Sequence, residues 1–219
     1  MLLLDEWNTR LQQAQIEAIV FDLDNTLIDR DSAFKACTAA LWKAYQSLPL
    51  SHNIWEEIID KDHRGYTPRT IFYPWLQMRF FPLLSSLEIE QFYQTHLSTY
   101  LPPSEQALLS WLQALKEKYT LAILSNGGSQ NQRAKLANSQ LDQRFDPDQI
   151  FISGELSYRK PQLAIFTHVA ELMGVQPSQL IMVGDHPTND IKGAEAAGWL
   201  TFSTDYPQLI TALKQHTYV

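Results

Sequence analysis

Short apolar segments followed directly by acidic or hydroxyl-bearing residues restrict the fold of this sequence more than any other feature. The first segment covers residues 17–21 and leads into Asp22. The pattern returns, alternating with helix-like stretches, at 121–124, 150–152 and 200–202, and at 180–183 with Gly184 before the acidic Asp185. Strands that are apolar at successive positions are buried on both faces, and strand–helix alternation with short connections is typical of a parallel sheet. We therefore predict an α/β fold with a doubly wound parallel sheet.

Proline and glycine mark the ends of the predicted helices. One helix opens after Pro102-Pro103-Ser104, and another covers 161–173, with Pro161 at its first position and Gly174 at its end. Further helices are predicted at 129–140, 188–197 and 207–215. A short helix between Asp5 and Gln15 is expected to lie on the core.

The segment between residues 30 and 100 has a different composition. The stretch from Trp42 to Tyr100 holds 12 of the 25 aromatic residues, whereas seven of the eight glycines lie from Gly127 onward. The segment contains no convincing strand, and helices are predicted at 31–48, 54–61, 70–81 and 86–99. We predict a core domain formed by 1–29 and 101–219, and a helical domain formed by 30–100.

Charge and composition limit the class of protein. The chain is 45% hydrophobic and 19% charged, as ordinary globular proteins are. A net charge of −7 argues against an extended nucleic-acid surface, which needs a basic face, but it does not exclude a small anionic substrate. No apolar stretch reaches the ~18 residues of a membrane span, and the first residues do not resemble a secretory signal. We expect a cytoplasmic protein without membrane or nucleic-acid partners; its oligomeric state is left open.

The single cysteine, Cys37, excludes an intramolecular disulfide. It lies in a helix-like run and is interpreted as a small buried hydrophobic residue rather than a reactive thiol.

Asp22, Asp24 and Thr26 follow the first strand. Side chains two positions apart in an extended segment face the same way, so both carboxylates can point into one crevice. A divalent cation between them would reduce their repulsion, and Mg²⁺ prefers such oxygen ligands. A polar turn after a strand explains this cluster, taken alone, about as well.

Ser125 and Asn126 follow the second strand, directly before two glycines. A hydroxyl, approachable backbone N–H groups and the start of a helix suit an anion, although Ser and Asn are also ordinary helix caps. Lys160 precedes the predicted helix at 161–173, where the helix dipole disfavours a cation unless it faces an anion. The alternative is a solvated surface lysine.

Asp185 and Asp190 follow the strand at 180–183. Acidic residues there also suit the start of a helix, and the adjacent His186 is interpreted as a packed or capping residue. Each of the four clusters is a weak signal alone. Together they place carboxylates, a hydroxyl and a lysine at strand ends, where ligands bind in such sheets.

These clusters resemble the motifs of the haloacid dehalogenase (HAD) superfamily of aspartate-nucleophile hydrolases. The four matching segments are Phe21 to Leu27, Leu121 to Asn126, Lys160-Pro161 and Gly184 to Asp190. The resemblance covers residues 17 to about 204. It implies a Rossmann-like core with a helical cap domain inserted between the first two motifs.

The resemblance also implies roles. Asp22 would be the nucleophile and Asp24 the general acid and base. Mg²⁺ would be held by Asp22, Asp185 and the main-chain carbonyl of Asp24, with Asp190 supporting these ligands. The residues expected to bind phosphate are Thr26, Ser125, Asn126 and Lys160.

Asp24 favours hydrolysis of a phosphate monoester, because dehalogenase members lack an acid there. The expected substrate is a small phosphorylated metabolite such as a sugar phosphate, a nucleotide or an FMN-like monoester. A phosphomutase, which keeps this aspartate, and a non-catalytic binding protein on the same core are the alternatives.

His63, Arg64 and Arg69 flank a Gly/Pro-containing loop of the helical domain. They are candidates for reading a second anionic group of the substrate. Five nearby aromatic residues are candidates for stacking on a flat ring, but are better interpreted as the domain's own core: Tyr66, Tyr73, Trp75, Phe80 and Phe81.

Overall fold

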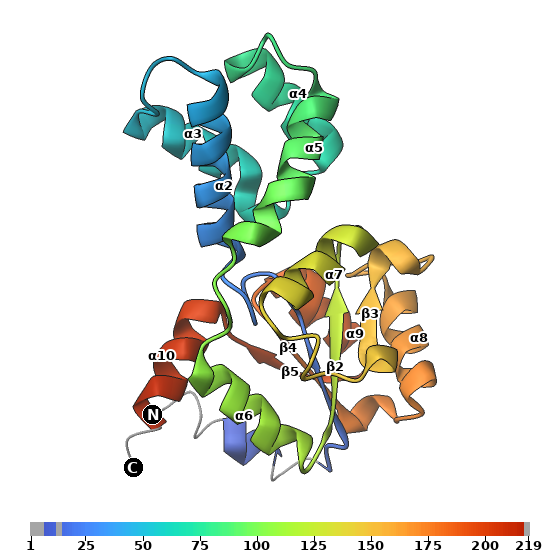
Figure 1. Cartoon of the computed structure of the whole chain (residues 1–219). Helices are drawn as coiled ribbons and strands as arrows, with labels where there is room; N and C mark the ends of the chain where they lie inside the picture. Colours follow the sequence, from blue (N-terminus) through green and yellow to red (C-terminus); the bar gives the residue numbers. More distant parts are fainter. Residues whose placement is uncertain (1–6, 12–14, 217–219) are drawn as a thin grey trace. The chain divides into compact units, whose positions relative to one another are not determined.

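The computed structural model describes residues 7–11 and 15–216. The chain divides into two compact units (Figure 1). Unit 1 consists of Met1–Asp29 and Pro102–Val219, and unit 2 consists of Arg30–Leu101. Unit 2 contains the segment from residue 30 to residue 100 that the sequence predicted to be helical.

Unit 1 is built on a five-stranded sheet whose neighbouring strands are all parallel. The strand order is β3-β2-β1-β4-β5. This confirms the predicted doubly wound α/β fold. The strands are β1 (Ala18–Phe21), β2 (Thr120–Ser125), β3 (Ile150–Ile152), β4 (Leu180–Gly184) and β5 (Leu200–Ser203).

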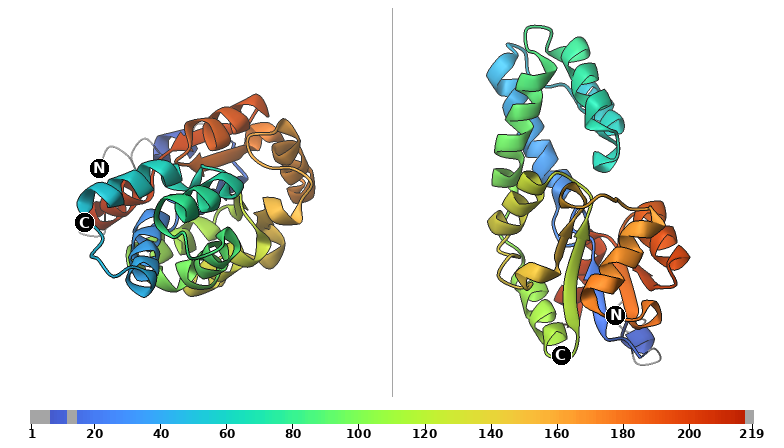
Figure 2. Two further views of the ribbon diagram at one scale, coloured as in Figure 1. Left: turned by 90° about the horizontal axis from the view of Figure 1, so that it is seen from above. Right: turned by 90° about the vertical axis from the view of Figure 1, so that its right-hand side faces the viewer.

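Helices cover both faces of this sheet (Figure 2). They are α6 (Gln106–Lys116), α7 (Ser129–Asn138), α8 (Leu163–Met173), α9 (Gly193–Ala196) and α10 (Tyr206–His216). Successive residues of β1 serve opposite faces. Ala18 and Val20 pack in one core cluster with α8 and α9. On the other face Phe21 contacts Trp111 of α6, with ring centroids 5.8 Å apart.

Part of the predicted N-terminal helix lies within the described residues. Residues 7–11 are helical, and both Trp7 and Leu11 are buried. The ring of Trp7 lies 5.7 Å from that of Trp111 and 5.1 Å from that of Phe202. The remainder of that predicted helix, at 5–6 and 12–14, lies outside the described residues.

Two predicted helices need correction. The helix predicted from Pro161 begins at Leu163, because Pro161 sits in a turn closed by a hydrogen bond from the Gln162 N–H to the Arg159 carbonyl. The helix predicted at 188–197 is a wide π-turn, Pro187–Lys192, followed by the short α9. The π-turn forms because the N–H of Ile191 bonds the His186 carbonyl five residues earlier.

Unit 2 is entirely helical. It contains α2 (Arg30–Tyr45), α3 (His52–Asp62), α4 (Arg69–Phe80) and α5 (Ser86–His96), with short 3₁₀ turns at His63–Gly65 and Leu97–Tyr100. Ser51 caps α3, and Ser85 with Glu88 forms a capping box on α5. The local sequence therefore fixes where these helices start.

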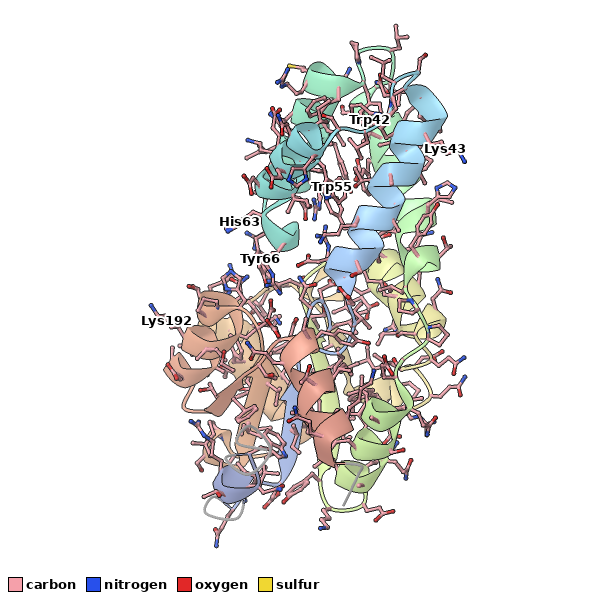
Figure 3. The ribbon with its side chains drawn as sticks, turned by 90° about the vertical axis from the view of Figure 1, so that its left-hand side faces the viewer. Trp42, Lys43, Trp55, His63, Tyr66 and Lys192 are labelled. Atoms are coloured by element: carbon pink, nitrogen blue, oxygen red, sulfur yellow. The ribbon has the colours of Figure 1, made fainter. Side chains whose placement is uncertain are left out.

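Aromatic residues form the core of unit 2. Trp42 of α2 is labelled in Figure 3 and packs against Phe80 and Phe81. Tyr73 and Phe81 are buried, and Trp75 and Phe80 pack against the same cluster. Four of the five aromatic candidates therefore serve the core of this unit, while Tyr66 lies beside His63 at the surface turn.

Cys37 also belongs to this core and is fully buried. Burial raises the pKa of its thiol to about 12, against the opposing charge of Arg30. The interpretation of Cys37 as a small hydrophobic residue is confirmed.

A buried ion cluster holds the turn after α3. Asp62 accepts hydrogen bonds from both Arg30 and Arg69, the latter at 2.7 Å, and from the Gly65 N–H at 2.8 Å. The three residues that follow Asp62 all have positive φ, from 49° to 88°. Asp62 is 1% exposed, so it supplies the acceptor that keeps this uncommon turn closed.

Among the described residues, no helix has both the length and the apolar character needed to cross a membrane.

Candidate active site

The candidate site lies at the carboxyl ends of the central strands of unit 1. β1 runs beside β2 on one side and β4 on the other, with Phe21 opposite Ile123 and Val183. The residues that follow these strands therefore meet at one edge. From β1 the strand order runs to β2 and β3 on one side and to β4 and β5 on the other. Doubly wound sheets bind ligands at the point where the strand order reverses in this way.

The loop after β1 is fixed by its own backbone. The N–H groups of Leu27 and Ile28 bond the carbonyl of Leu23 at 3.0 and 3.2 Å. Asn25 adopts φ 61°, a left-handed conformation that Asn tolerates better than most residues. This tight turn holds Asp22 and Asp24 at the strand end. The Thr26 hydroxyl lies 3.4 Å from Asp22 Oδ2.

Lys160 joins two acidic residues that are distant in the sequence. Its Nζ lies 2.7 Å from Asp22 Oδ1 and 2.6 Å from Asp190 Oδ1, and all three residues are buried. Burial opposes the charge of Lys160, but the two carboxylates outweigh it and raise its pKa. The site thus contains a permanent cation in contact with Asp22.

Asp22 is electrostatically unusual. Burial raises its pKa to about 8; the ammonium of Lys160 opposes this rise, and the negative charge of Asp190 adds to it. An ionised Asp22 therefore needs more positive charge than Lys160 alone supplies.

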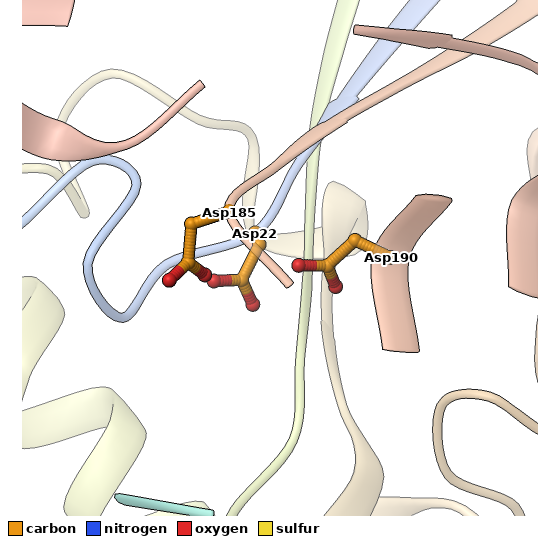
Figure 4. A group of neighbouring side chains, drawn as sticks. All are labelled: Asp22, Asp185 and Asp190. Atoms are coloured by element: carbon orange, nitrogen blue, oxygen red, sulfur yellow. The ribbon is translucent and has the colours of Figure 1, made fainter. Parts of the chain in front are cut away.

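Three carboxylates gather around this point (Figure 4). Asp22, Asp185 and Asp190 each present an oxygen, and these oxygens lie within 4.8 Å of one another. Asp190 Oδ1 accepts a hydrogen bond from Lys160, and its Oδ2 accepts one from the His186 N–H at 3.0 Å. Such a set of hard oxygen donors suits a divalent cation. The hydrogen bonds of Asp190 are those of a residue that orients its neighbours.

His186 acts as a helix cap, as predicted. Its Nδ1 accepts hydrogen bonds from the N–H groups of Thr188 and Asn189 at 3.0 and 2.9 Å.

Gly184, at the end of β4, lies against Asp190. A Cβ at position 184 would lie 2.5 Å from Asp190 Cγ. We expect Gly184→Ala to displace the Asp190 carboxylate from Lys160, to destabilise unit 1 by about 1–3 kcal/mol, and to lower any activity of the site about 10- to 100-fold. Urea unfolding and phosphatase assays check this, and a variant with wild-type activity and stability would contradict it.

Asn126 connects two of the predicted motifs. Its side-chain amide donates to the Lys160 carbonyl at 2.9 Å and accepts from the Lys160 N–H at 3.0 Å. The Asn126 side chain, which was predicted to bind phosphate, therefore forms hydrogen bonds with the main chain of Lys160. It positions that lysine, and a direct phosphate contact stays a prediction.

Two side chains of α7 enter the site without having been predicted. Lys135 Nζ lies 2.7 and 2.8 Å from the two carboxylate oxygens of Asp24. Gln132 Nε2 donates to Asp24 Oδ2 at 2.9 Å and to the Ser125 hydroxyl. Their i, i+3 spacing puts both on one helix face, and that spacing is the only sequence signal that could have suggested them.

The structure thus brings eight predicted residues together in unit 1: Asp22, Asp24, Thr26, Ser125, Asn126, Lys160, Asp185 and Asp190. His63, Arg64 and Arg69 lie in unit 2. Arg69 is paired with Asp62 and lines a pocket of about 300 Å³ together with Thr70, Tyr73, Pro74, Ser86 and Glu90. The role of these three residues in substrate choice stays a prediction.

Comparisons with known proteins agree with this class of site. A sequence profile of the haloacid dehalogenase-like hydrolases matches residues 19–203, and the chain belongs to this family. It is 30% identical to N-acylneuraminate-9-phosphatase of Rattus norvegicus over 216 residues, covering 89% of this chain and 86% of that protein. It is 29% identical to glyceraldehyde 3-phosphate phosphatase of Methanothermobacter thermautotrophicus, covering 84% and 83%.

Solved structures show the same fold. The HAD hydrolase YfnB from Bacillus subtilis, in a crystal structure bound to magnesium, superposes with a TM-score of 0.74 and 22% identity, covering 91% of this chain and 99% of that one. The predicted family membership is confirmed, and the chain is an enzyme of the phosphatase branch of that family.

Proposed function

We propose that the protein is a Mg²⁺-dependent phosphatase that hydrolyses a small phosphorylated metabolite through a phosphorylated Asp22. The observation that supports this most is the buried Asp22 carboxylate, held by Lys160 at the end of β1 beside Asp185 and Asp190. Positioned carboxylates are established nucleophiles in covalent catalysis. The geometry gives Asp22 both a fixed direction and a neighbouring cation.

The donor set fits Mg²⁺. Asp22 and Asp185 would hold the ion together with the main-chain carbonyl of Asp24, while Asp190 would orient its neighbours. The support is geometric, because Asp22, Asp185 and Asp190 each present an oxygen and these oxygens lie within 4.8 Å of one another. A bound Mg²⁺ would supply positive charge that keeps Asp22 ionised and balances the charge of the phosphoryl group.

In the first step, an Asp22 carboxylate oxygen attacks the phosphorus atom and the bond to the leaving oxygen breaks. Asp24, which must be protonated when this step begins, gives its proton to that oxygen, so a neutral alcohol leaves. Lys160 has three N–H donors, two of which are used by Asp22 and Asp190, and the third would hold a phosphoryl oxygen. The oxygen of the Ser125 hydroxyl accepts a hydrogen bond from Gln132, so this hydroxyl would donate its own hydrogen to a second phosphoryl oxygen.

In the second step, water attacks the phosphorus of the aspartyl phosphate. Asp24 accepts the proton of that water, inorganic phosphate leaves, and the Asp22 carboxylate is restored. Each proton that Asp24 gives in the first step returns in the second, so the enzyme ends the cycle unchanged.

The names of the relatives define the substrates to test. They include phosphatases of a sugar acid phosphate, a triose phosphate and a nucleotide. We propose a small phosphomonoester of this kind, read in part by His63, Arg64 and Arg69 of unit 2.

Removal of the metal tests the proposal. With Mg²⁺, the purified protein is expected to release inorganic phosphate from an aryl phosphate and from members of a panel of sugar phosphates, nucleoside monophosphates and FMN. EDTA is expected to lower kcat at least about 100-fold, and added Mg²⁺ to restore it.

The same assay separates the alternatives. Turnover that moves phosphate between two positions of one sugar, without phosphate release, would indicate a mutase. No turnover across the panel, despite Mg²⁺ binding measured by calorimetry, would indicate a non-catalytic binding protein.

A further inference from the structure

The surroundings of Asp24 suggest a role for α7 beyond the roles proposed so far. Lys135 is nearly buried, and its ammonium contacts both oxygens of the Asp24 carboxylate. The pair joins residues 111 positions apart in the chain. Taking a lysine out of water costs free energy that an exposed pair would not incur, so its burial at this carboxylate requires an explanation.

Gln132 links Asp24 to a second residue of the site. Its Nε2 donates one hydrogen to Asp24 Oδ2 and the other to the Ser125 hydroxyl. The residue is 1% exposed, and a Cβ on Gly127 would lie 3.0 Å from its side chain. The glycine after Asn126 therefore leaves the space that Gln132 occupies.

We propose that Lys135 and Gln132 are positioning residues that set where the Asp24 carboxylate stands relative to Asp22 and Ser125. Lys135 holds both oxygens of the ionised carboxylate, and Gln132 fixes the distance of that carboxylate from the Ser125 hydroxyl. When Asp24 carries the proton that it gives to the leaving oxygen, that proton takes the place of one of the two Lys135 contacts. The inference rests on the proposed function, in which Asp24 gives its proton to the leaving oxygen. A proton donor misplaced by about 1 Å loses much of its effect.

A leaving-group comparison tests this positioning role. Loss of the proton donor should affect a phosphate ester with an alkoxide-like leaving group far more than 2,4-dinitrophenyl phosphate, whose leaving group is stable as an anion. We expect Lys135→Met to lower kcat/KM for phenyl phosphate about 10- to 100-fold and for 2,4-dinitrophenyl phosphate less than about threefold. The ratio of the two values is independent of the fraction of folded protein.

Matched variants sharpen the test. Lys135→Arg, which can also contact both carboxylate oxygens, is expected to restore the ratio to within about threefold of wild type. Gln132→Leu should change the ratio in the same direction as Lys135→Met. Lys116→Met removes a lysine from an exposed pair with Asp146 and should leave the ratio unchanged.

Asp24→Asn separates failure of this inference from failure of the proposed function. If Asp24→Asn changes the ratio and Lys135→Met does not, the positioning role is wrong while the function stands. An equal loss on both substrates in Lys135→Met also overturns the positioning role, because a general structural defect would give it. If Asp24→Asn itself leaves the ratio unchanged, the proposed role of Asp24 is wrong.

Discussion

Asp22→Asn is expected to lower kcat for phosphate release by more than about 10³-fold while the chain stays folded. The amide has the shape of the carboxylate but lacks the nucleophilic oxygen that would bond to phosphorus. The fold should tolerate the change because burial already disfavours the charged form of Asp22, whose pKa is raised to about 8. Lys160 keeps its second partner, Asp190. Steady-state assays and urea unfolding measure the two effects separately.

A matched control is available on the surface of unit 1. Asp142 is exposed, and Asp142→Asn should retain wild-type activity. Traces of wild-type protein can imitate residual activity in the Asp22→Asn preparation. The residual rate of this preparation should therefore be compared with the fraction of its molecules that phosphate labels covalently. Substantial activity in Asp22→Asn, at even a tenth of the wild-type rate, would contradict the proposed nucleophile.

The core of unit 1 was predictable because each part of its signal is local. β1 is apolar at four successive positions and is fully buried, and Asp22 and Asp185 directly follow β1 and β4. Parallel topology then brings distant strand ends together, so Asp22 and Asp185 could be placed in one site without knowledge of any contact.

The contacts that orient the site were not predictable in this way. The pairs Lys135–Asp24 and Asn126–Lys160 join residues 111 and 34 positions apart. One sequence contains no signal for such pairs beyond the spacing of polar residues along a helix. The error at Pro161 has a similar origin, because Pro is common at the first position of a helix and is equally suited to a turn.

In unit 2 the helices were predicted, but the ion cluster was not. The predicted role of Arg69 in reading the substrate stays a prediction, and the structure adds that Arg69 pairs with Asp62. Asp62 was not singled out at all, because an Asp near the end of a helix usually faces solvent. Its burial depends on Arg30, which lies 32 positions earlier.

Asp62→Asn is expected to destabilise unit 2 by about 3 kcal/mol near neutral pH. The variant removes the buried carboxylate that pairs with the guanidinium of Arg30 and leaves the partly exposed Asp31 at 3.4 Å; that guanidinium also lies 4.5 Å from the Phe34 ring. The Gly65 N–H loses its charged acceptor in the turn of positive φ. Hydrogen exchange of backbone amides within residues 30–101, compared with those of unit 1, measures the local effect.

The stabilisation that Asp62 gives to unit 2 is expected to depend on pH. Burial alone would raise the pKa of Asp62, but the charges and hydrogen bonds of Arg30 and Arg69 outweigh it, and the pKa is lowered. A carboxyl group whose pKa is lowered on folding stabilises the fold above its unfolded pKa of about 3.9. This contribution is lost as the pH falls through the folded-state pKa. The difference between wild type and Asp62→Asn should therefore be full at pH 5 to 7 and shrink below about pH 4.

Glu57→Gln is the matched control for this experiment. Glu57 also pairs with an arginine, Arg79, at 2.8 Å, but both side chains are exposed, at 38% and 57%. Water screens such a pair, so its removal should change exchange rates little at any pH. If Asp62→Asn behaved like Glu57→Gln at pH 7, the cluster would not stabilise unit 2. If instead the difference from wild type persisted unchanged at pH 3, the ionised carboxylate would not be its source.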